Sequence, residues 1–76
     1  MPKKDIVKEL RQVINDALEE FGTERDIRVG PNVLTLVDEY NMMVWKLEKE
    51  EGIELEMIPY EPTIAQIAEV LSVNHN

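Results

Sequence analysis

The chain has no cysteine, only three glycines, and one residue each of tryptophan, phenylalanine and histidine among its 76 residues. The absence of cysteine excludes disulfides, thiolate metal sites and a cysteine nucleophile. The one histidine, His75, stands next to last in a polar stretch that we expect to be solvated, so no histidine metal site or histidine-activated nucleophile can be assembled. There is also no glycine-rich phosphate loop. These absences predict a non-enzymatic chain without cofactor or metal.

Positive charge and long apolar runs are scarce as well. Eight lysines and arginines face sixteen carboxylates, and the net charge is -8. Nucleic-acid binding depends on cations that neutralise phosphates, so we expect no nucleic-acid ligand. The apolar runs fall far short of the roughly 20 residues that span a bilayer, and no signal peptide is evident, so we expect no membrane association and a cytoplasmic location. The acidity favours a protein partner with a basic surface, or serves solubility alone.

What the sequence does contain is helical periodicity. Residues 3–21 predict a first helix that ends at Gly22, and residues 32–51 predict a central helix that begins with Asn32 as its N-cap and ends at Gly52. In the first helix the apolar side chains recur at three- and four-residue steps, at Ile6, Val7, Leu10, Val13, Ile14, Ala17, Leu18 and Phe21. In the central helix they are Val33, Leu36, Val37, Tyr40, Met43, Val44 and Leu47.

Two segments admit alternatives. Residues 42–57 also fit a β-hairpin, since Ile53, Leu55 and Met57 alternate, but the unbroken helical pattern upstream favours the helix. Between the helices, Ile27 and Val29 alternate with charged residues, which fits either a short strand or a loop that tucks both against the core. We favour the loop because a Gly-Pro pair follows directly.

Prolines 59 and 62 predict that residues 53–60 form an extended linker whose alternate apolar side chains cover the core. Thr63 and Gln66 form a capping-box pattern that opens a last helix over residues 63–72. We expect residues 73–76 to fray. The fold class is therefore all-α, a single domain over residues 1–76, built as a small three- to four-helix bundle with an extended linker before the last helix.

Length, acidity, the order of helices and two segments, residues 47–55 and 63–71, resemble those of acyl carrier proteins, the small helical domains that carry a phosphopantetheine arm. In that family a glycine and an Asp-Ser-Leu motif open the central helix, and the serine bears the arm. Here the matching run is Gly30-Pro31-Asn32-Val33-Leu34, which places Val33 at the serine position. Valine has no hydroxyl, so the resemblance implies an acyl-carrier-like fold without the attachment. A carrier modified at another hydroxyl, Thr35 or Ser72, is an alternative.

The central helix carries a second apolar stripe opposite its core face. At about 100° per residue, Leu34, Met42 and Trp45 share this side with charged residues, an unusual pattern for a simple surface helix. Partner enzymes dock on the same helix face in the carrier family. We predict a partner-binding surface made of Leu34, Asp38, Glu39, Met42, Trp45 and Lys49. Alternatively, the linker or the last helix covers this face.

The sequence therefore predicts a non-enzymatic interaction domain that binds a basic protein partner as a monomer or weak homodimer. A different class of function also fits the charge, namely a small acidic inhibitor or nucleic-acid mimic of the phage type that blocks a basic protein surface.

Overall fold

The computed structural model describes residues 2–74, and within that range the chain forms three helices and no strand. They are α1 (Lys3–Glu19), α2 (Pro31–Glu51) and α3 (Ile64–Val73). The all-α prediction is confirmed, and a fourth helix is absent from residues 2–74. His75 and the end of the tail predicted to fray lie outside the described residues. No helix in the described range is both long enough and apolar enough to cross a membrane.

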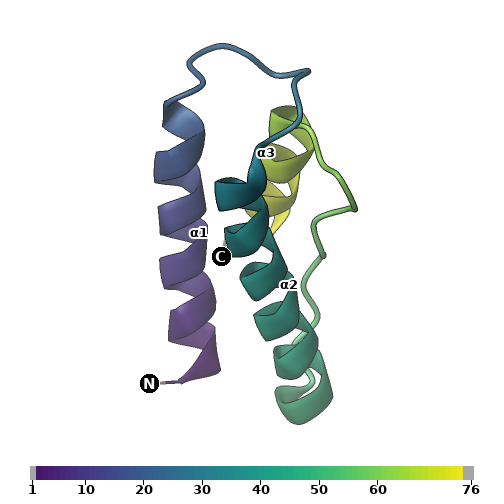
Figure 1. Ribbon diagram of the computed structural model, residues 1–76. Coiled ribbons are helices and arrows are strands. Elements are labelled where there is room, and N and C mark those ends of the chain that lie inside the picture. The colour runs from purple at the N-terminus through teal and green to yellow at the C-terminus, as the bar shows by residue number, and fades with distance from the viewer. Residues whose placement is uncertain (1, 75–76) are drawn as a thin grey trace.

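The helices form two unequal layers. α1 and α2 run antiparallel side by side, and α3 lies behind them (Figure 1). α3 has only 10 residues against 21 in α2, so at about 1.5 Å per residue it is less than half as long. It therefore covers the upper part of the α1–α2 pair and leaves the lower part to the linker of residues 53–62 (Figure 1).

Gly52 is the C-cap of α2 as predicted, whereas α1 ends at Glu19 with Glu20 as its C-cap, two residues before the predicted end at residue 21. α1 ends before Gly22, whose φ is 63°, and α2 ends before Gly52, whose φ is 69°. The Asn32 N-cap is wrong, because α2 begins at Pro31 with Gly30 as its N-cap and no side-chain cap. Proline suits the first helical position, where its fixed φ is already helical and its missing N–H would have no partner. The Thr63 capping box of α3 is confirmed.

The loop between α1 and α2 completes the start of α3. The N–H groups of Ile64 and Ala65 donate to the carbonyls of Ile27 and Arg25 at 3.1 Å each. These bonds satisfy two of the donors that every helix leaves free at its N-terminus. Val29 is buried as predicted, but Ile27 is 41% exposed, so the prediction that both tuck inward is half correct. The carbonyl contact to α3 explains the difference, because it holds the Ile27 backbone rather than its side chain.

The core draws on all three helices, the loop and the linker. Its buried members are Val7, Ile14, Leu18, Val29, Val33, Val37, Tyr40, Val44, Leu47, Ile58, Ile64, Ile67, Val70 and Leu71. The helix prediction for residues 42–51 is thus confirmed over the hairpin, because Val44 and Leu47 lie fully inside on α2.

The linker is held by two asparagine side chains. The Asn41 amide accepts from Ile58 N at 2.8 Å and donates to Ile58 O at 2.9 Å. The Asn74 amide does the same for Glu56, with both distances 2.8 Å. The predicted alternation breaks between these points: Ile53 and Leu55 pack on the core, but Ile58 is buried in the place expected for Met57, which is 43% exposed. Asn41 draws the Ile58 backbone against α2.

The prediction that the tail frays from residue 73 is wrong for its first two residues. Val73 is the last residue of α3, and Asn74 is buried with its amide bonded to Glu56 and, at 2.9 Å, to the hydroxyl of Tyr40. From sequence alone, a polar residue near the end of the chain is expected to be exposed to water. In the structure Asn74 instead donates a hydrogen bond to the hydroxyl of the buried Tyr40.

Candidate functional site

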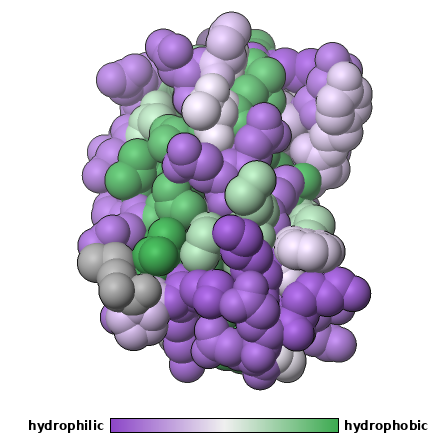
Figure 2. All heavy atoms as spheres, turned by 60° about the horizontal axis from the view of Figure 1, so that its bottom comes forward, coloured by the Kyte–Doolittle hydropathy of each residue, from purple (hydrophilic) through white to green (hydrophobic). Residues whose placement is uncertain are grey.

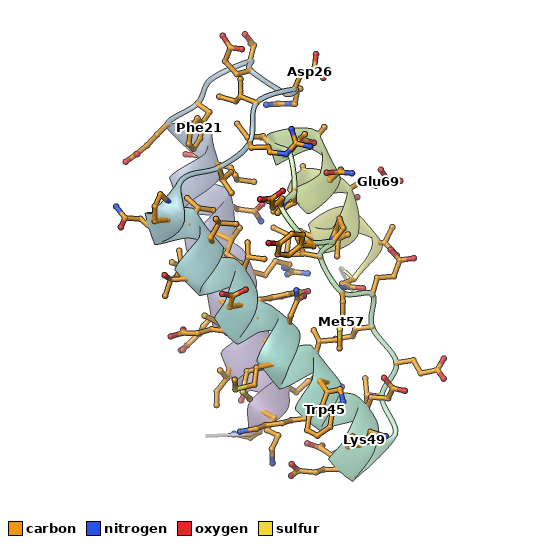
Figure 3. All side chains as sticks on the ribbon, turned by 45° about the vertical axis from the view of Figure 1, so that its right-hand side comes forward. Phe21, Asp26, Trp45, Lys49, Met57 and Glu69 are labelled. Atoms are coloured by element: carbon orange, nitrogen blue, oxygen red, sulfur yellow. The ribbon has the colours of Figure 1, made fainter. Side chains whose placement is uncertain are left out.

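The outer face of α2 exposes large apolar side chains. Met42 is 58% exposed and Trp45 is 49% exposed, although both belong to the helix that supplies much of the core. The Lys49 ammonium lies 5.9 Å from the centroid of the Trp45 ring, one turn further along α2 (Figure 3). At that distance the cation is attracted to the face of the indole, which orients the ring on the helix surface.

The structure places five of the six predicted partner-binding residues in one stripe. At about 100° per residue, Leu34, Asp38, Met42, Trp45 and Lys49 fall within an arc of about 80° on the α2 surface. The sixth, Glu39, lies about 60° beyond Met42 and borders the stripe instead of forming part of it. We call the stripe and Glu39 together the α2 outer face. Asp38, Glu39 and Lys49 are exposed, whereas Leu34 is half-buried against the core.

The linker covers only one end of this face. A hollow of about 400 Å³ lies between the first half of α2 and the end of the linker, where Leu34 sits beside Pro59 and Tyr60. Its lining consists of Leu34, Val37, Asp38, Asn41, Ile58, Pro59, Tyr60, Glu61 and Pro62. The alternative prediction was that the linker covers the apolar stripe. It holds in part for Leu34, which is half-buried, whereas Met42 and Trp45 are exposed to solvent.

Sequence reasoning missed three residues of this region. Met57, 43% exposed, extends the apolar surface from α2 onto the linker (Figure 3). Tyr60, 91% exposed, does so at the other end, where it lines the hollow with Leu34. Asn41 positions that segment through its paired hydrogen bonds to Ile58. A carboxamide can donate and accept hydrogen bonds like a peptide group. An asparagine at the border of an apolar helix stripe could therefore have indicated that an extended segment binds there.

The carrier resemblance involves three positions, namely Val33 and the alternative hydroxyl residues Thr35 and Ser72, and the structure places two of them on α2 and one on α3. Val33, at the position of the carrier serine, is 8% exposed and belongs to the core. The Thr35 hydroxyl donates to the carbonyl of Pro31 at 3.0 Å on the exposed side of α2. Ser72 is exposed on α3, the helix behind the α1–α2 pair.

Across residues 2–74, no three histidine or carboxylate side chains are grouped so that they could hold a metal ion. Comparison of the chain with protein-family models, with curated proteins and with solved structures finds no match. The physical properties of the site are thus what a functional proposal must rest on.

Proposed function

We propose that this chain is a non-enzymatic protein-interaction domain that binds a partner with a basic surface through the α2 outer face. The observation that carries the proposal is the exposure of Trp45 and Met42 on a helix whose other side is fully buried. Tryptophan is enriched among residues that dominate binding energy, and methionine adapts its shape to a partner. An apolar surface of this kind with a charged border is typical of an interaction site.

The chemistry of the border supports a basic partner. Asp38 and Glu39 stand beside the apolar stripe, and Glu61 lines the hollow at its end. With a net charge of -8, the chain attracts a cationic surface over a distance of about one Debye length, roughly 8 Å at physiological salt. The carboxylates would accelerate encounter, while Trp45 and Met42 would hold the complex once formed.

The proposal includes an acyl-carrier-like form of the domain without the phosphopantetheine attachment. A long first helix, an irregular loop, a central helix and a short last helix support this part, together with the burial of Val33. Its test is the intact mass of the protein after incubation with coenzyme A and a broad-specificity phosphopantetheinyl transferase. We expect an unchanged mass. A mass increase matching the arm would contradict the proposal and make Thr35 or Ser72 the attachment site.

The binding surface itself is tested by comparing Trp45→Ala with Val13→Ala. Val13 is 46% exposed on α1, so the second variant removes an apolar side chain of similar exposure from another surface. Proteins captured from the source cells by the unaltered chain are identified, and their affinity for each variant is measured. We expect Trp45→Ala to weaken the partner at least about thirtyfold and Val13→Ala to leave it within about twofold.

Equal losses in both variants would contradict a site on α2. Salt dependence separates the proposal from the acidic inhibitor or nucleic-acid mimic. An apolar interface retains most of its affinity as salt is raised, whereas a charge mimic of nucleic acid loses it steeply. Sedimentation of the free protein shows in the same preparation whether the Trp45 surface is occupied by a second copy.

A further inference from the structure

A second hollow, of about 460 Å³, lies where α3 is too short to cover the lower part of the α1–α2 pair. It is bounded by the first half of α1, by the start of the linker and by the end of α3. Figure 2, which turns the lower end of the molecule forward, shows hydrophobic side chains gathered between hydrophilic ones on that end. The lining consists of Lys4, Asp5, Val7, Lys8, Arg11, Leu47, Ile53, Leu55 and Asn74. We call it the α1 pocket.

The lining of the α1 pocket separates into an apolar floor and a cationic rim. Val7 and Leu47 belong to the buried core, and Ile53 and Leu55 pack against it from the linker. The rim residues Lys4, Lys8 and Arg11 follow one another at steps of four and three along α1 and therefore stand on one side of the helix. Ligand pockets of a few hundred Å³ combine such an apolar lining with a few convergent polar groups.

The rim of the α1 pocket is positively charged, whereas the chain as a whole is strongly negative. Three of the eight lysines and arginines line this one hollow of a protein with a net charge of -8, and Asp5 is the single carboxylate among the lining residues. Neighbouring Lys3 shows the contrast, because its ammonium lies 2.7 Å from the carboxylate of Glu50. That hydrogen bond raises the pKa of Lys3 and lowers the pKa of Glu50.

Among the described residues, no carboxylate lies within salt-bridge distance of Lys4, Lys8 or Arg11. Burial raises the pKa of Tyr40, and the hydrogen bond from Asn74 and the positive charge of Arg11 oppose that rise. Lys4 and Lys8 are exposed on α1, whereas Arg11 is half-buried.

We infer that the α1 pocket binds a small amphiphilic anion, with its apolar body on the floor of Val7, Leu47, Ile53 and Leu55 and its carboxylate or phosphate head between Lys8 and Arg11. An anionic head matches the rim charge, and a short alkyl or aromatic body matches the floor. This site is separate from the α2 outer face, and its ligand has the opposite charge to the partner proposed there.

The test titrates octanoate, octyl phosphate and octyltrimethylammonium into the full-length protein and follows methyl resonances by NMR. We expect both anions to shift the methyl groups of Val7, Ile53 and Leu55 with saturation, and the cation of equal chain length to bind at least tenfold more weakly. Comparison of the two anions shows which head group is preferred. Equal binding of the cation, or shifts centred on Trp45, would overturn the inference.

Two double variants separate the pocket from general electrostatics. Lys8→Gln with Arg11→Gln removes two positive charges from the rim, and Lys46→Gln with Lys49→Gln removes the same charge from α2. Glutamine has nearly the helix propensity of lysine and arginine, so both proteins are expected to fold, which circular dichroism checks. We expect the first pair to weaken octanoate binding about tenfold and the second to change it less than twofold. Equal weakening by both pairs would overturn the inference.

Discussion

Both sides of α2 carry large apolar side chains, and the outward side also carries the charged residues Asp38, Glu39 and Lys49. The inward side places Tyr40, Val44 and Leu47 at 0% exposure, whereas the outward side leaves Trp45 at 49% and Met42 at 58%. Apolar residues on both sides differ in what covers them. α1, α3 and the linker pack on the inward side, whereas on the outward side the end of the linker lines a hollow with Leu34 and Asp38 and leaves Met42 and Trp45 exposed. An apolar side chain stabilises the fold only where another element removes it from water.

The largest expected difference between the sides is in stability. Leu47→Ala on the inward side removes a fully buried side chain and leaves a cavity. We expect the free energy of unfolding to fall by about 2–5 kcal/mol, which is a large part of the stability of a domain this small. Urea denaturation followed by circular dichroism measures it. A loss below about 1 kcal/mol would mean that the core at this end of α2 collapses around the change.

The polar link on the inward side comes next. Asn74→Ala removes three hydrogen bonds and leaves the Glu56 backbone and the Tyr40 hydroxyl without partners. We expect a loss of about 2–3 kcal/mol, and a smaller loss of about 1–2 kcal/mol for Asn41→Ala, which removes two hydrogen bonds to Ile58. The same denaturation assay compares the two. Equal stability of Asn74→Ala and the unaltered protein would contradict an ordered end of α3.

Tyr40→Phe isolates one of those bonds and adds a pH signature. At neutral pH we expect a loss of about 1 kcal/mol, because the Asn74 amide loses its acceptor. Burial raises the pKa of Tyr40, so the folded state retains the proton longer than the unfolded state does. The contribution of protonated Tyr40 to stability is complete below the ordinary tyrosine pKa of about 10. It is lost as the pH rises through the raised pKa that Tyr40 has in the folded state.

Denaturation between neutral and strongly alkaline pH checks this point. The alkaline loss of stability is expected to shrink in Tyr40→Phe and to persist in the control Tyr60→Phe, because Tyr60 is 91% exposed. Identical alkaline profiles for the two variants would show that Tyr40 ionises as freely as a surface tyrosine.

The smallest change in stability is expected on the outward side. Trp45→Ala replaces a half-exposed indole with the best helix former, so the lost contacts and the gained propensity oppose each other. We expect the free energy of unfolding to change by about 1 kcal/mol or less, although the same variant is the one expected to weaken partner binding about thirtyfold. A loss near that of Leu47→Ala would assign Trp45 to the core and remove the basis of the proposed binding surface.

Much of the fold was predictable because its signals are local. The Thr63 capping box and the glycine stop at Gly52 are short-range patterns, and each appears where predicted. One local signal failed, because Gly30 and not Asn32 caps α2, and other errors concern polar residues that act at long range. Asn41 and Asn74 bond to residues 17 and 18 positions away, and sequence spacing within a helix contains no information about such partners.

The candidate site divides in the same way. Periodicity identified Trp45 and Met42 as opposite to the core stripe of α2, and the structure places both on the surface. It did not identify Met57 and Tyr60, which join that surface only because the linker runs beside α2. Nor did it identify the α1 pocket, whose lining combines α1, the end of α2, the linker and Asn74, the residue that follows α3.

By itself, the sequence determined that this chain is helical, where its helices begin and end to within a few residues, and that α2 has two apolar sides. Backbone propensity, capping and side-chain periodicity act over about one or two helical turns, so they can be read along the chain. Only the tertiary structure decided which apolar side is covered, where the linker lies and which cations remain unpaired. Those outcomes depend on the unequal lengths of α2 and α3 and on contacts between segments far apart in sequence.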